Sequence, residues 1–596
     1  MDRRQFVKSA MYFTVASATL GLQACGGGGA SGAASQSKGS YSFPQGVASG
    51  DPKDSSIVFW TRCISASGAK EDIPLKLEVS TSADFAQLAA SVTLAATEKY
   101  DFTVRAKITG LTPAATYYYR FIAGADVSPA GRSKTAPAAA STPAQMRFAW
   151  MTCQDWTVNH WGAMELLAQE ELDFLVHLGD YIYETVGATF QSGVAEPAHK
   201  AITLPEGKKN NAGAIYAVSV DDYRSLYKTY RSDARLQALH AKFPLIAIWD
   251  DHEFSDDAWQ DHQTYSNGNL QETARRRSAN QAWAEYMPID FGDVSFDLNN
   301  SAYNNIRIYR DFKFGSLMHL VMTDQRLYRD DHVVPEATIA NLLGKDPVNG
   351  NDSIGSRYFV PLPIIEAFEK SSAAALQRAP SILGTTQTQW WKDTMKNSSA
   401  IWKIWGNEVT LNRCFLDMRQ QAPAPYNNLY VINADCWDGY PTHKADILGY
   451  LKAQNIKNVV AITGDLHAFQ CGVVRDKQDI ATGTPVLVDF VSAGISSDSW
   501  YTYIKQGAGT TPLAALVANP QTYDAVVRAN NPDFAYLDHH AQGYALAQVT
   551  ADSFTVLFKK VKPLNADGSK PAEPLLKTTR ITLAAGSSTP QVQDNV

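Results

Sequence analysis

Short apolar runs separated by turn residues mark the first part of the chain, between residues 41 and 137. They predict β-strands at residues 57–62, 75–80, 102–108 and 116–123, where apolar, aromatic and β-branched side chains dominate. A segment of about a hundred residues with this pattern is typical of a small β-sandwich. We therefore expect an all-β domain of the immunoglobulin or fibronectin kind. The proline-, alanine- and serine-rich residues 138–145 then predict a linker.

From residue 146 to residue 596 the pattern alternates between strand and helix periods. Strands are predicted at residues 147–152, 173–178, 242–249, 402–406 and 458–463, and helices at residues 163–171, 275–287 and 444–454. Antiparallel pairs are predicted at residues 309–325 and near the end of the chain, with a turn at Asp552. This alternation predicts an α/β domain with a mainly buried sheet and helices outside it. The polar stretches 187–217 and 330–356 are expected to be surface insertions.

Polar residues follow the carboxyl end of five of the predicted strands. In chain order they are Cys153, residues 180–183, residues 250–253, Asn407 and residues 465–467. Ligands bind at this edge of open α/β sheets, because loops from several strands converge there. Each cluster alone has a structural alternative, such as a turn that Asp180 caps. Five in succession favour a functional site.

The residue types in these clusters are those of metal ligands. The thiolate of Cys153 and the phenolate of Tyr183 are anionic donors that suit ferric iron better than zinc or magnesium. Carboxylates such as Asp180, Asp251 and Asp465 suit a divalent ion with oxygen ligands, Ca²⁺, Mg²⁺ or Mn²⁺. Asp180 offers two oxygens and is the candidate bridging ligand.

Single residues of the clusters also fit purely structural roles. Cys153, at a strand end, fits a small buried hydrophobe. His467 fits a core histidine, and Asp250 with Asp251 fits a solvated turn.

The first residues predict export. Arg3-Arg4 within RRQFVK is a twin-arginine signature, and LQAC ends the apolar run 10–22 as a bacterial lipobox with Cys25 as the lipidated residue. Residues 1–25 are thus interpreted as a lipoprotein signal, and the glycine- and serine-rich residues 26–40 as a flexible tether. The alternative is a plain signal peptide with an incidental cysteine. The expected location is the periplasm or the outer membrane, with a lipid on Cys25 as the membrane contact.

The overall charge limits the partners. The net charge of −7 gives no global basic field for nucleic acid, and we expect a monomer without a nucleic-acid site. Cys63, Cys414, Cys436 and Cys471 remain available for disulfides outside the cytoplasm, and Cys414–Cys436 is the pairing we expect.

The motifs resemble those of one family. In order, the chain carries FPQGVASGDP and IVFWTR, then HLGDYIYE, IWDDHEFSDD, RRRSANQAWAEYMP, TDQRLYR, DGYPTHK and GDLHAF. This series resembles the alkaline phosphatase D (PhoD-like) family of metallophosphoesterases. The resemblance implies a two-sheet α/β sandwich flanked by helices, preceded by the small all-β domain. One departure is Asp324-Gln325-Arg326, where the family more often has Asp-Thr-Arg.

The resemblance also implies roles for residues. It implies a ferric ion and a calcium ion, with Mg²⁺ or Mn²⁺ as alternatives at the second site. The implied metal ligands are Cys153, Asp180, Tyr183, Asp250, Asp251, Asp465 and His467.

Three further residues receive candidate catalytic roles. His252 would assist the leaving oxygen, and Asn407 would be a ligand or a phosphate contact. Arg326 would grip a phosphate oxygen. Its alternative is a structural ion pair with Asp324 or Asp330.

The expected function is hydrolysis of phosphate mono- or diesters, in small molecules, phospholipids or polymers, by a metal-activated hydroxide. No serine or threonine nucleophile is needed, so no phosphoenzyme is expected. The alternatives are a phospholipase D-like diesterase and a catalytically inactive surface-binding lipoprotein. The intact ligand series argues against the inactive protein.

Overall fold

The computed structural model describes residues 14–17, 41–157, 161–187, 194–210, 213–264, 269–335, 338–343, 357–508 and 514–596. The predicted lipid attachment at Cys25 and the tether lie outside the described residues. Of the predicted signal, only the strand β1 (Thr14–Ser17) is described. In the part of the chain described, no helix is long and apolar enough to cross a membrane.

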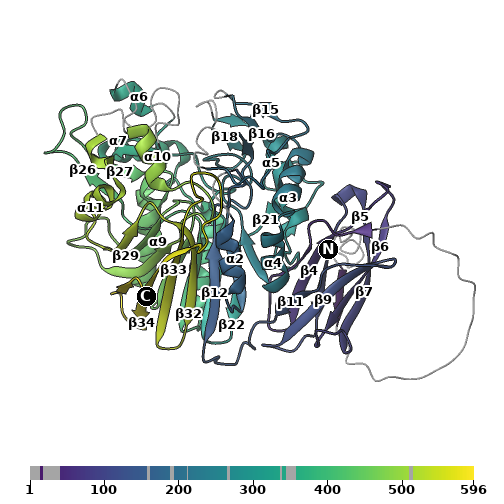
Figure 1. Ribbon diagram of the computed structural model, residues 1–596. Coiled ribbons are helices and arrows are strands. Elements are labelled where there is room, and N and C mark those ends of the chain that lie inside the picture. Colours follow the sequence, from purple (N-terminus) through teal and green to yellow (C-terminus); the bar gives the residue numbers. More distant parts are fainter. Residues whose placement is uncertain are drawn as a thin grey trace, which may run out of the picture.

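The first large sheet, sheet A, runs through the centre of the molecule (Figure 1). Its strand order is β1-β8-β4-β3-β17-β13-β12-β32-β33-β34-β35. The bounds are β8 (Thr103–Thr109), β4 (Ser56–Arg62), β3 (Val47–Gly50), β17 (Leu245–Ile248), β13 (Phe174–Leu178), β12 (Met146–Met151), β32 (Gln542–Val549), β33 (Ser553–Val561), β34 (Leu575–Ala584) and β35 (Gln591–Asp594). The strands β12, β13 and β17 pair in parallel, so their carboxyl ends share one edge.

The second large sheet, sheet B, has the order β22-β23-β25-β28-β30-β29-β31. The bounds are β22 (Arg310–Phe314), β23 (Met318–Met322), β25 (Trp402–Asn407), β28 (Val459–Thr463), β30 (Pro485–Val491), β29 (Phe469–Arg475) and β31 (Phe534–Asp538). Parallel pairing joins β23, β25, β28 and β30. Sheet B therefore also gathers several carboxyl ends at one edge.

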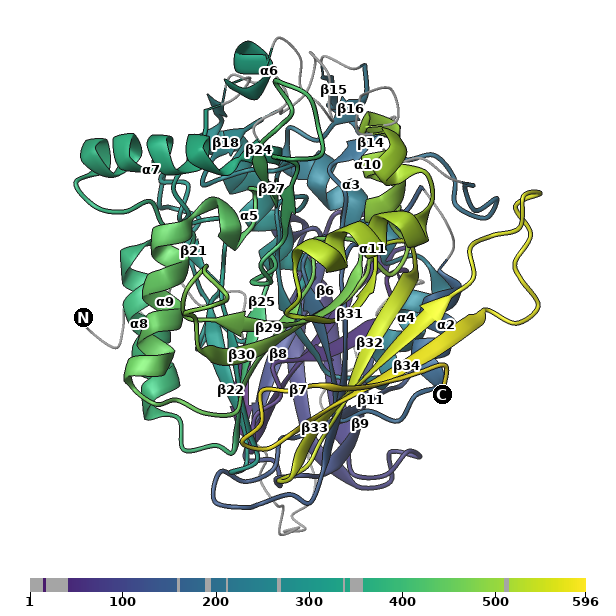
Figure 2. The same cartoon turned by 90° about the vertical axis from the view of Figure 1, so that its left-hand side faces the viewer.

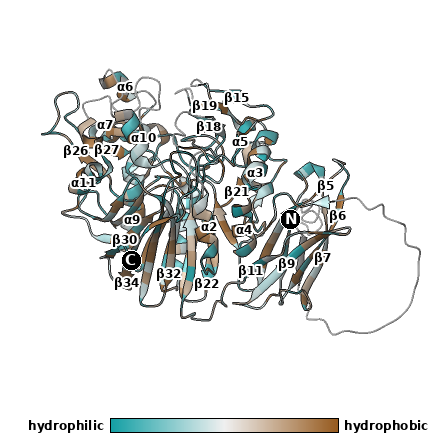
Figure 3. Cartoon of the chain, viewed as in Figure 1, coloured by the Kyte–Doolittle hydropathy of each residue, from teal (hydrophilic) through white to brown (hydrophobic). Residues whose placement is uncertain are grey.

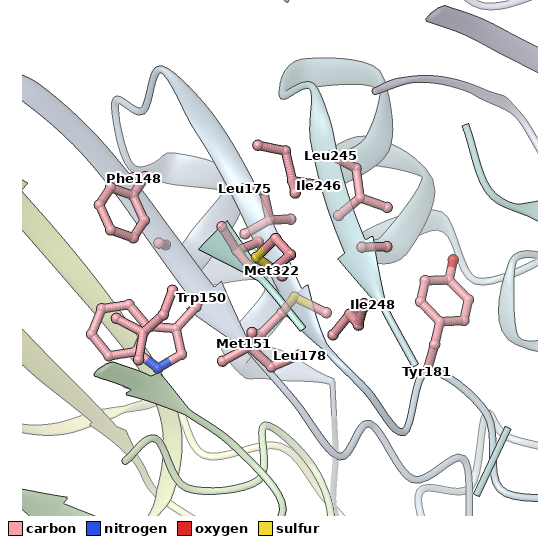
Figure 4. Close-up of a cluster of buried hydrophobic side chains, with 14 of the residues drawn as sticks. Phe148, Trp150, Met151, Leu175, Leu178, Tyr181, Leu245, Ile246, Ile248 and Met322 are labelled. Atoms are coloured by element: carbon pink, nitrogen blue, oxygen red, sulfur yellow. The ribbon is translucent and has the colours of Figure 1, made fainter. Parts of the chain in front are cut away.

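A single hydrophobic cluster joins the two sheets. Phe148 of β12, Leu175 of β13 and Met322 of β23 all belong to it, and each is fully buried. Figure 4 shows Met322, from sheet B, among side chains of sheet A. The strands are correspondingly hydrophobic in Figure 3. This shared core fixes the position of one sheet against the other.

Helices cover the outer faces of both sheets. On the sheet A side, α2 packs against α4 and α3 against α5. On the sheet B side, α8 packs against β23 and α9 against β30, and the two helices lie side by side (Figure 2). The bounds are α2 (Gly162–Gln169), α3 (Val220–Tyr230), α4 (Ala234–Lys242), α5 (Thr273–Tyr286), α7 (Leu362–Leu376), α8 (Gly384–Asn397), α9 (Pro441–Ala453), α10 (Trp500–Ala508) and α11 (Pro520–Asn530). The described chain is thus a mixed α/β structure rich in sheet.

The N-terminal strands form two β-layers. A smaller sheet, sheet C, contains β10 (Asp126–Val127), β9 (Thr116–Ala123), β6 (Ile73–Ser80), β7 (Leu88–Ala96) and β11 (Gly131–Lys134). It packs over β3, β4 and β8 through a hydrophobic cluster of its own. The second layer continues into sheet A, because Gly50 of β3 pairs with Leu245 of β17. A side chain at Gly50 would place its Cβ 2.7 Å from the Leu245 carbonyl oxygen, so only glycine allows this contact.

Most predicted strands are confirmed, whereas the one predicted disulfide is wrong. The predicted strand at residues 242–249 is shorter than expected, since Lys242 still belongs to α4. The expected Cys414–Cys436 bridge is wrong, because both thiols are free and buried. The Cys436 thiol instead donates to the Asn433 carbonyl at 2.9 Å.

Candidate metal centre

The predicted ligands sit where strands end abruptly. Cys153 follows β12, Asp180 follows β13, and Asp465 and His467 follow β28. All four adopt left-handed backbone conformations, with φ between 54° and 59°. Residues other than glycine rarely adopt this conformation, which costs about 1–3 kcal/mol. The chain thus turns sharply at each strand end, and it does so at the residues whose side chains meet.

The first group of donor atoms joins both sheets. Atoms of Cys153, Asp180 and His467 all lie within 4.8 Å of one another. The Tyr183 hydroxyl lies 3.2 Å from Nε2 of His467. The structure therefore brings together the thiol, the phenol, the imidazole and the shared carboxylate that the sequence predicted.

Carboxylates form the next groups beside it. A second group contains Asp180, Asp251 and His252. A third contains Asp250, Asp251 and Asp465. In each group the donor atoms lie within 4.8 Å of one another. Asp180 thus stands between the thiol-containing group and the carboxylate groups. This is the position that a bridging ligand requires.

Of these groups, Asp180, Asp251, His252, Asp465 and His467 line a cavity of about 130 Å³, whereas Cys153 and Asp250 are not part of its lining. A further carboxylate group on its wall contains Asp251, Asp256 and Asp257. Sequence reasoning missed Asp256 and Asp257 as candidate ligands. The available signal was their position directly after the residues 250–253 cluster, within the same loop.

Electrostatics show that the site fits cations. Burial, together with neighbouring carboxylates, raises the pKa of Asp180 and of Asp465 well above the usual range. Burial likewise raises the pKa of the Cys153 thiol and the Tyr183 phenol. In addition, the buried Oδ2 of Asp250 has no hydrogen-bond partner, and the buried Oδ1 of Asp251 has none beyond an ion pair with Nη2 of Arg326 at 3.5 Å. Buried anionic donors of this kind are stabilised by bound cations, and thiolate, phenolate and carboxylate are all cation ligands.

Arg326 is an ion-pair hub and not a phosphate contact. Its guanidinium is fully buried and does not line the cavity. Nε pairs with Asp250, Nη1 lies 2.8 Å from Asp435, and Nη2 lies 3.2 Å from Asp465. The expected grip on a phosphate oxygen is not what this geometry provides, because the donors are already engaged. The alternative pairing with Asp324 or Asp330 is also not observed for the guanidinium, and it is the backbone N–H of Arg326 that donates to Asp324, at 3.1 Å.

Asn407 is likewise engaged by the protein. Its side-chain amide donates to the Val409 carbonyl at 2.5 Å and to the Thr463 hydroxyl at 2.9 Å. Its oxygen accepts from Gln325 and from the Trp437 indole. Asn407 is not among the residues that line the cavity. Asn407 therefore has a structural role in this protein: its hydrogen bonds connect neighbouring segments outside the cavity.

His252 does face the cavity, and a buried glutamate holds it. Its Nδ1 lies 2.7 Å from Glu184 Oε2, while Nε2 lies on the side of Asp256 at 3.6 Å. Burial lowers the pKa of His252, but Asp251, Glu184 and Asp180 outweigh it and raise the pKa well above the usual value. Sequence reasoning missed Glu184, although it ends the HLGDYIYE motif.

Glu253 connects two of the loops. It accepts from the backbone N–H of Asp180 and of Asp250 on one oxygen, at 3.0 and 2.8 Å, and from that of Tyr181 on the other, at 2.8 Å. The loops after β13 and β17 are thereby fixed to each other. Gly179 allows this approach, since a Cβ there would lie 2.3 Å from the Cβ of Asp250.

Two family models, a relative and a solved structure identify the same protein family. The family model described as PhoD-like phosphatase matches residues 148–558, and the model of that family's N-terminal domain matches residues 29–137. Alkaline phosphatase D of Bacillus subtilis (strain 168) is 31% identical over 473 residues, which cover 78% of this chain and 71% of the relative. The solved structure described as "Structure of PhoD" has a TM-score of 0.71 at 25% identity and covers 92% of either chain. The chain therefore belongs to the PhoD-like phosphatase family, as a homologue of alkaline phosphatase D.

Proposed function

We propose that this phosphatase hydrolyses phosphate mono- and diesters at a centre of bound cations. The observation that carries the proposal is the meeting of ligand-type side chains from both sheets around one cavity, with buried carboxylate oxygens left without hydrogen-bond partners. A purely structural cluster would be expected to satisfy those oxygens within the protein. Membership of a phosphatase family supports the same reaction class.

The donor set divides between two kinds of cation. Cys153, Tyr183 and His467 would hold a ferric ion, because thiolate and phenolate are strong anionic donors. Asp250, Asp251 and Asp465 would hold calcium, with Mg²⁺ or Mn²⁺ as the alternatives, because these ions prefer oxygen ligands. Asp180 would be shared between the two.

Cations bound there would offset the negative charge of the phosphate and would lower the pKa of a bound water molecule. The residues of the chain then have separate tasks. His252, protonated and held by Glu184 through Nδ1, presents Nε2 to the cavity and gives its proton to the departing oxygen. No serine or threonine nucleophile takes part, so the phosphoryl group is transferred directly to water.

The remaining predictions concern location and the N-terminal strands. We also propose export by the twin-arginine route and lipid attachment at Cys25, on the strength of the RRQFVK and LQAC motifs. The two β-layers and the strand lengths support an immunoglobulin- or fibronectin-like domain ahead of the catalytic one.

Activity and metal content test the proposal together. Purified protein is assayed with p-nitrophenyl phosphate and bis-p-nitrophenyl phosphate, before and after chelation and with calcium restored. We expect hydrolysis that chelation abolishes and calcium restores in part, and iron in the metal analysis. The variant His252→Asn should lower kcat while retaining metal. Failure to cleave either ester with metals present would refute the proposal, and zinc alone in an active protein would refute the iron assignment.

A further inference from the structure

The segment that follows β17 carries its polar residues between two aromatic ones. Residues 250–253 include the candidate ligands Asp250 and Asp251 and the histidine that faces the cavity. Trp249 comes directly before them and Phe254 directly after them, and both aromatic side chains are buried. Neither ring lines the cavity. The two rings therefore lie at the ends of the segment that holds the carboxylates, so a shift of either ring would move one end of it.

One side chain of α5 contacts both rings. The guanidinium carbon of Arg276 lies 4.6 Å from the ring centroid of Trp249 and 5.1 Å from that of Phe254. Distances of this size are those of cation–π interactions, which are strongest where water is excluded. Arg276 thus connects the two ends of the segment through a single cation.

The surroundings of Arg276 are unusual for an arginine. Its side chain is fully buried, and within the part of the chain that the structure describes none of its nitrogens Nε, Nη1 and Nη2 has a hydrogen-bond partner. Burial lowers the pKa of Arg276, and the carboxylates of Asp324 and Glu253 are among the groups that oppose this shift. An uncharged side chain of similar size would fill the same space without the cost of burying a charge. This cost points to a role for the charge beyond packing.

The preceding arginine holds one end of the same segment through its backbone. Arg275 donates from Nη2 to the Phe254 carbonyl at 2.9 Å, and the hydroxyl of Tyr223 on α3 donates to the same carbonyl at 2.7 Å. These hydrogen bonds fix the segment where it ends. Arg276 adds the contact with Trp249, where the segment begins.

We propose that Arg276 is a positioning residue for the divalent cation: through the rings of Trp249 and Phe254, its guanidinium holds the carboxylates of residues 250–253 in the arrangement that binds the ion. This inference rests on the proposed function, and it gives a task to the RRRSANQAWAEYMP motif, of which Arg276 is the second residue. Arg276 does not line the cavity, so it acts through the segment and not on the substrate.

The two kinds of cation should respond differently to the loss of this guanidinium. The candidate iron ligands Cys153, Tyr183 and His467 follow β12, β13 and β28, whereas the segment that Arg276 contacts follows β17. Weaker binding of the divalent ion with undisturbed iron is therefore the signature of the proposed role. A general loosening of the fold would affect both ions.

Calcium binding measures the effect directly. The full-length protein, loaded with iron and freed of divalent ions, is titrated with calcium by calorimetry, and its iron content and visible absorption are recorded. Arg276→Met keeps the length of the side chain and removes its charge. We expect the calcium Kd to rise about tenfold or more, as for other groups that orient metal ligands, with unchanged iron. Arg276→Lys, which keeps a cation beside the rings, should bind calcium more tightly than Arg276→Met.

A ring variant tests the same contact from its other side. Phe254→Leu removes one of the two rings and should also raise the calcium Kd, by less than Arg276→Met does. In the double variant the two effects should be less than additive, because both substitutions remove one shared contact.

Arg105 of β8 supplies the matched control. It is buried, its guanidinium carbon lies 4.8 Å from the ring centroid of Phe291, and Nη2 donates to the Glu285 carbonyl at 2.9 Å, near the end of α5. Arg105→Met should lower the free energy of unfolding and leave the calcium Kd unchanged.

Four results would overturn the positioning role. They are a wild-type calcium Kd in Arg276→Met, no difference between Arg276→Met and Arg276→Lys, loss of iron together with calcium, and an equal rise of the Kd in Arg105→Met. If the wild type binds none of calcium, magnesium and manganese, the divalent site of the proposed function fails instead.

Discussion

The glutamate that joins two loops offers a sharp test of how the site is positioned. Glu253 is buried and accepts three backbone N–H groups, from Asp180, Tyr181 and Asp250. Both carboxylate oxygens are needed as acceptors. Glu253→Gln keeps the size of the side chain but replaces one acceptor by an NH₂ donor. At least one backbone N–H then faces another donor.

The expected loss of stability follows from the number of hydrogen bonds that the substitution removes or weakens. If the amide oxygen takes the place of the oxygen that binds Asp180 and Asp250, the Tyr181 N–H loses its acceptor. Loss of a hydrogen bond to a charged group costs about 1.5–3 kcal/mol, and the two remaining bonds weaken because their acceptor is now neutral. We expect the free energy of unfolding to fall by about 2–4 kcal/mol. Displacement of Asp180 and Asp250 should lower kcat/KM by about 10–100-fold, as for other groups that orient metal ligands.

The assay is urea unfolding together with kcat/KM and metal content, at about pH 8, because burial raises the pKa of Glu253 to about 7 and the carboxylate is charged above it. Glu369→Gln is the matched control. That carboxylate accepts from the backbone N–H and hydroxyl of Thr442, and it lies outside the cavity. The Glu369→Gln substitution should lower the free energy of unfolding and leave kcat/KM unchanged. A Glu253→Gln protein with wild-type stability and activity would refute the reasoning, and lost stability with full activity would refute the positioning role.

Four further outcomes are expected. Tyr183→Phe should lose the visible absorption of phenolate–iron charge transfer and retain less iron; an unchanged spectrum and iron content would show that the phenol is no ligand. Gly179→Ala should lower the free energy of unfolding by about 2 kcal/mol or more, through backbone strain and overlap with Asp250, and wild-type urea unfolding would contradict this. Burial raises the pKa of Asp538, but Lys560 outweighs it and lowers the pKa. The Asp538–Lys560 ion pair therefore stabilises the fold above about pH 4, and this stabilisation is lost as the pH falls. Asp538→Asn should make the free energy of unfolding, measured by urea titration, less dependent on pH in the acid range. Chelation should lower the thermal unfolding temperature, with reversal by added metal; an unchanged temperature after verified metal loss would argue against cation binding at the interface of the sheets.

Much of the site could be predicted because its signals are local. Continuous apolar runs followed by a polar residue identified β13 and β28 together with Asp180 and Asp465. A buried strand must be apolar on both faces, and the first polar residue after it marks the edge of the sheet. Where the residues after a strand carry ligand chemistry, sequence therefore locates the ligand as well as the strand.

The rest depends on contacts between distant segments. Sequence allowed Arg326 either a phosphate or an ion pair with nearby Asp324 or Asp330. The structure pairs it with Asp435 and Asp465, which are more than a hundred residues away. Likewise, α10 carries no strand-end signal, since Trp500 reaches the cavity through tertiary structure, with its backbone N–H donating to the His467 carbonyl. Pairing across such separations follows from the sheet arrangement, which local patterns do not specify.

The order of the sheets also explains why the ligands occupy strained backbone. Cys153 and Asp180 come from sheet A, whereas Asp465 and His467 come from sheet B, and the shared core holds the two edges at a fixed separation. A strand that simply continued would carry its next side chains to alternate faces, away from a common point. A left-handed residue shortly after the strand changes the direction of the chain, and the donor atoms of Cys153, Asp180 and His467 lie close together. The strain at each of these residues is compensated by the packing of the strands behind them, so the large hydrophobic core and the compact polar site are parts of the same design.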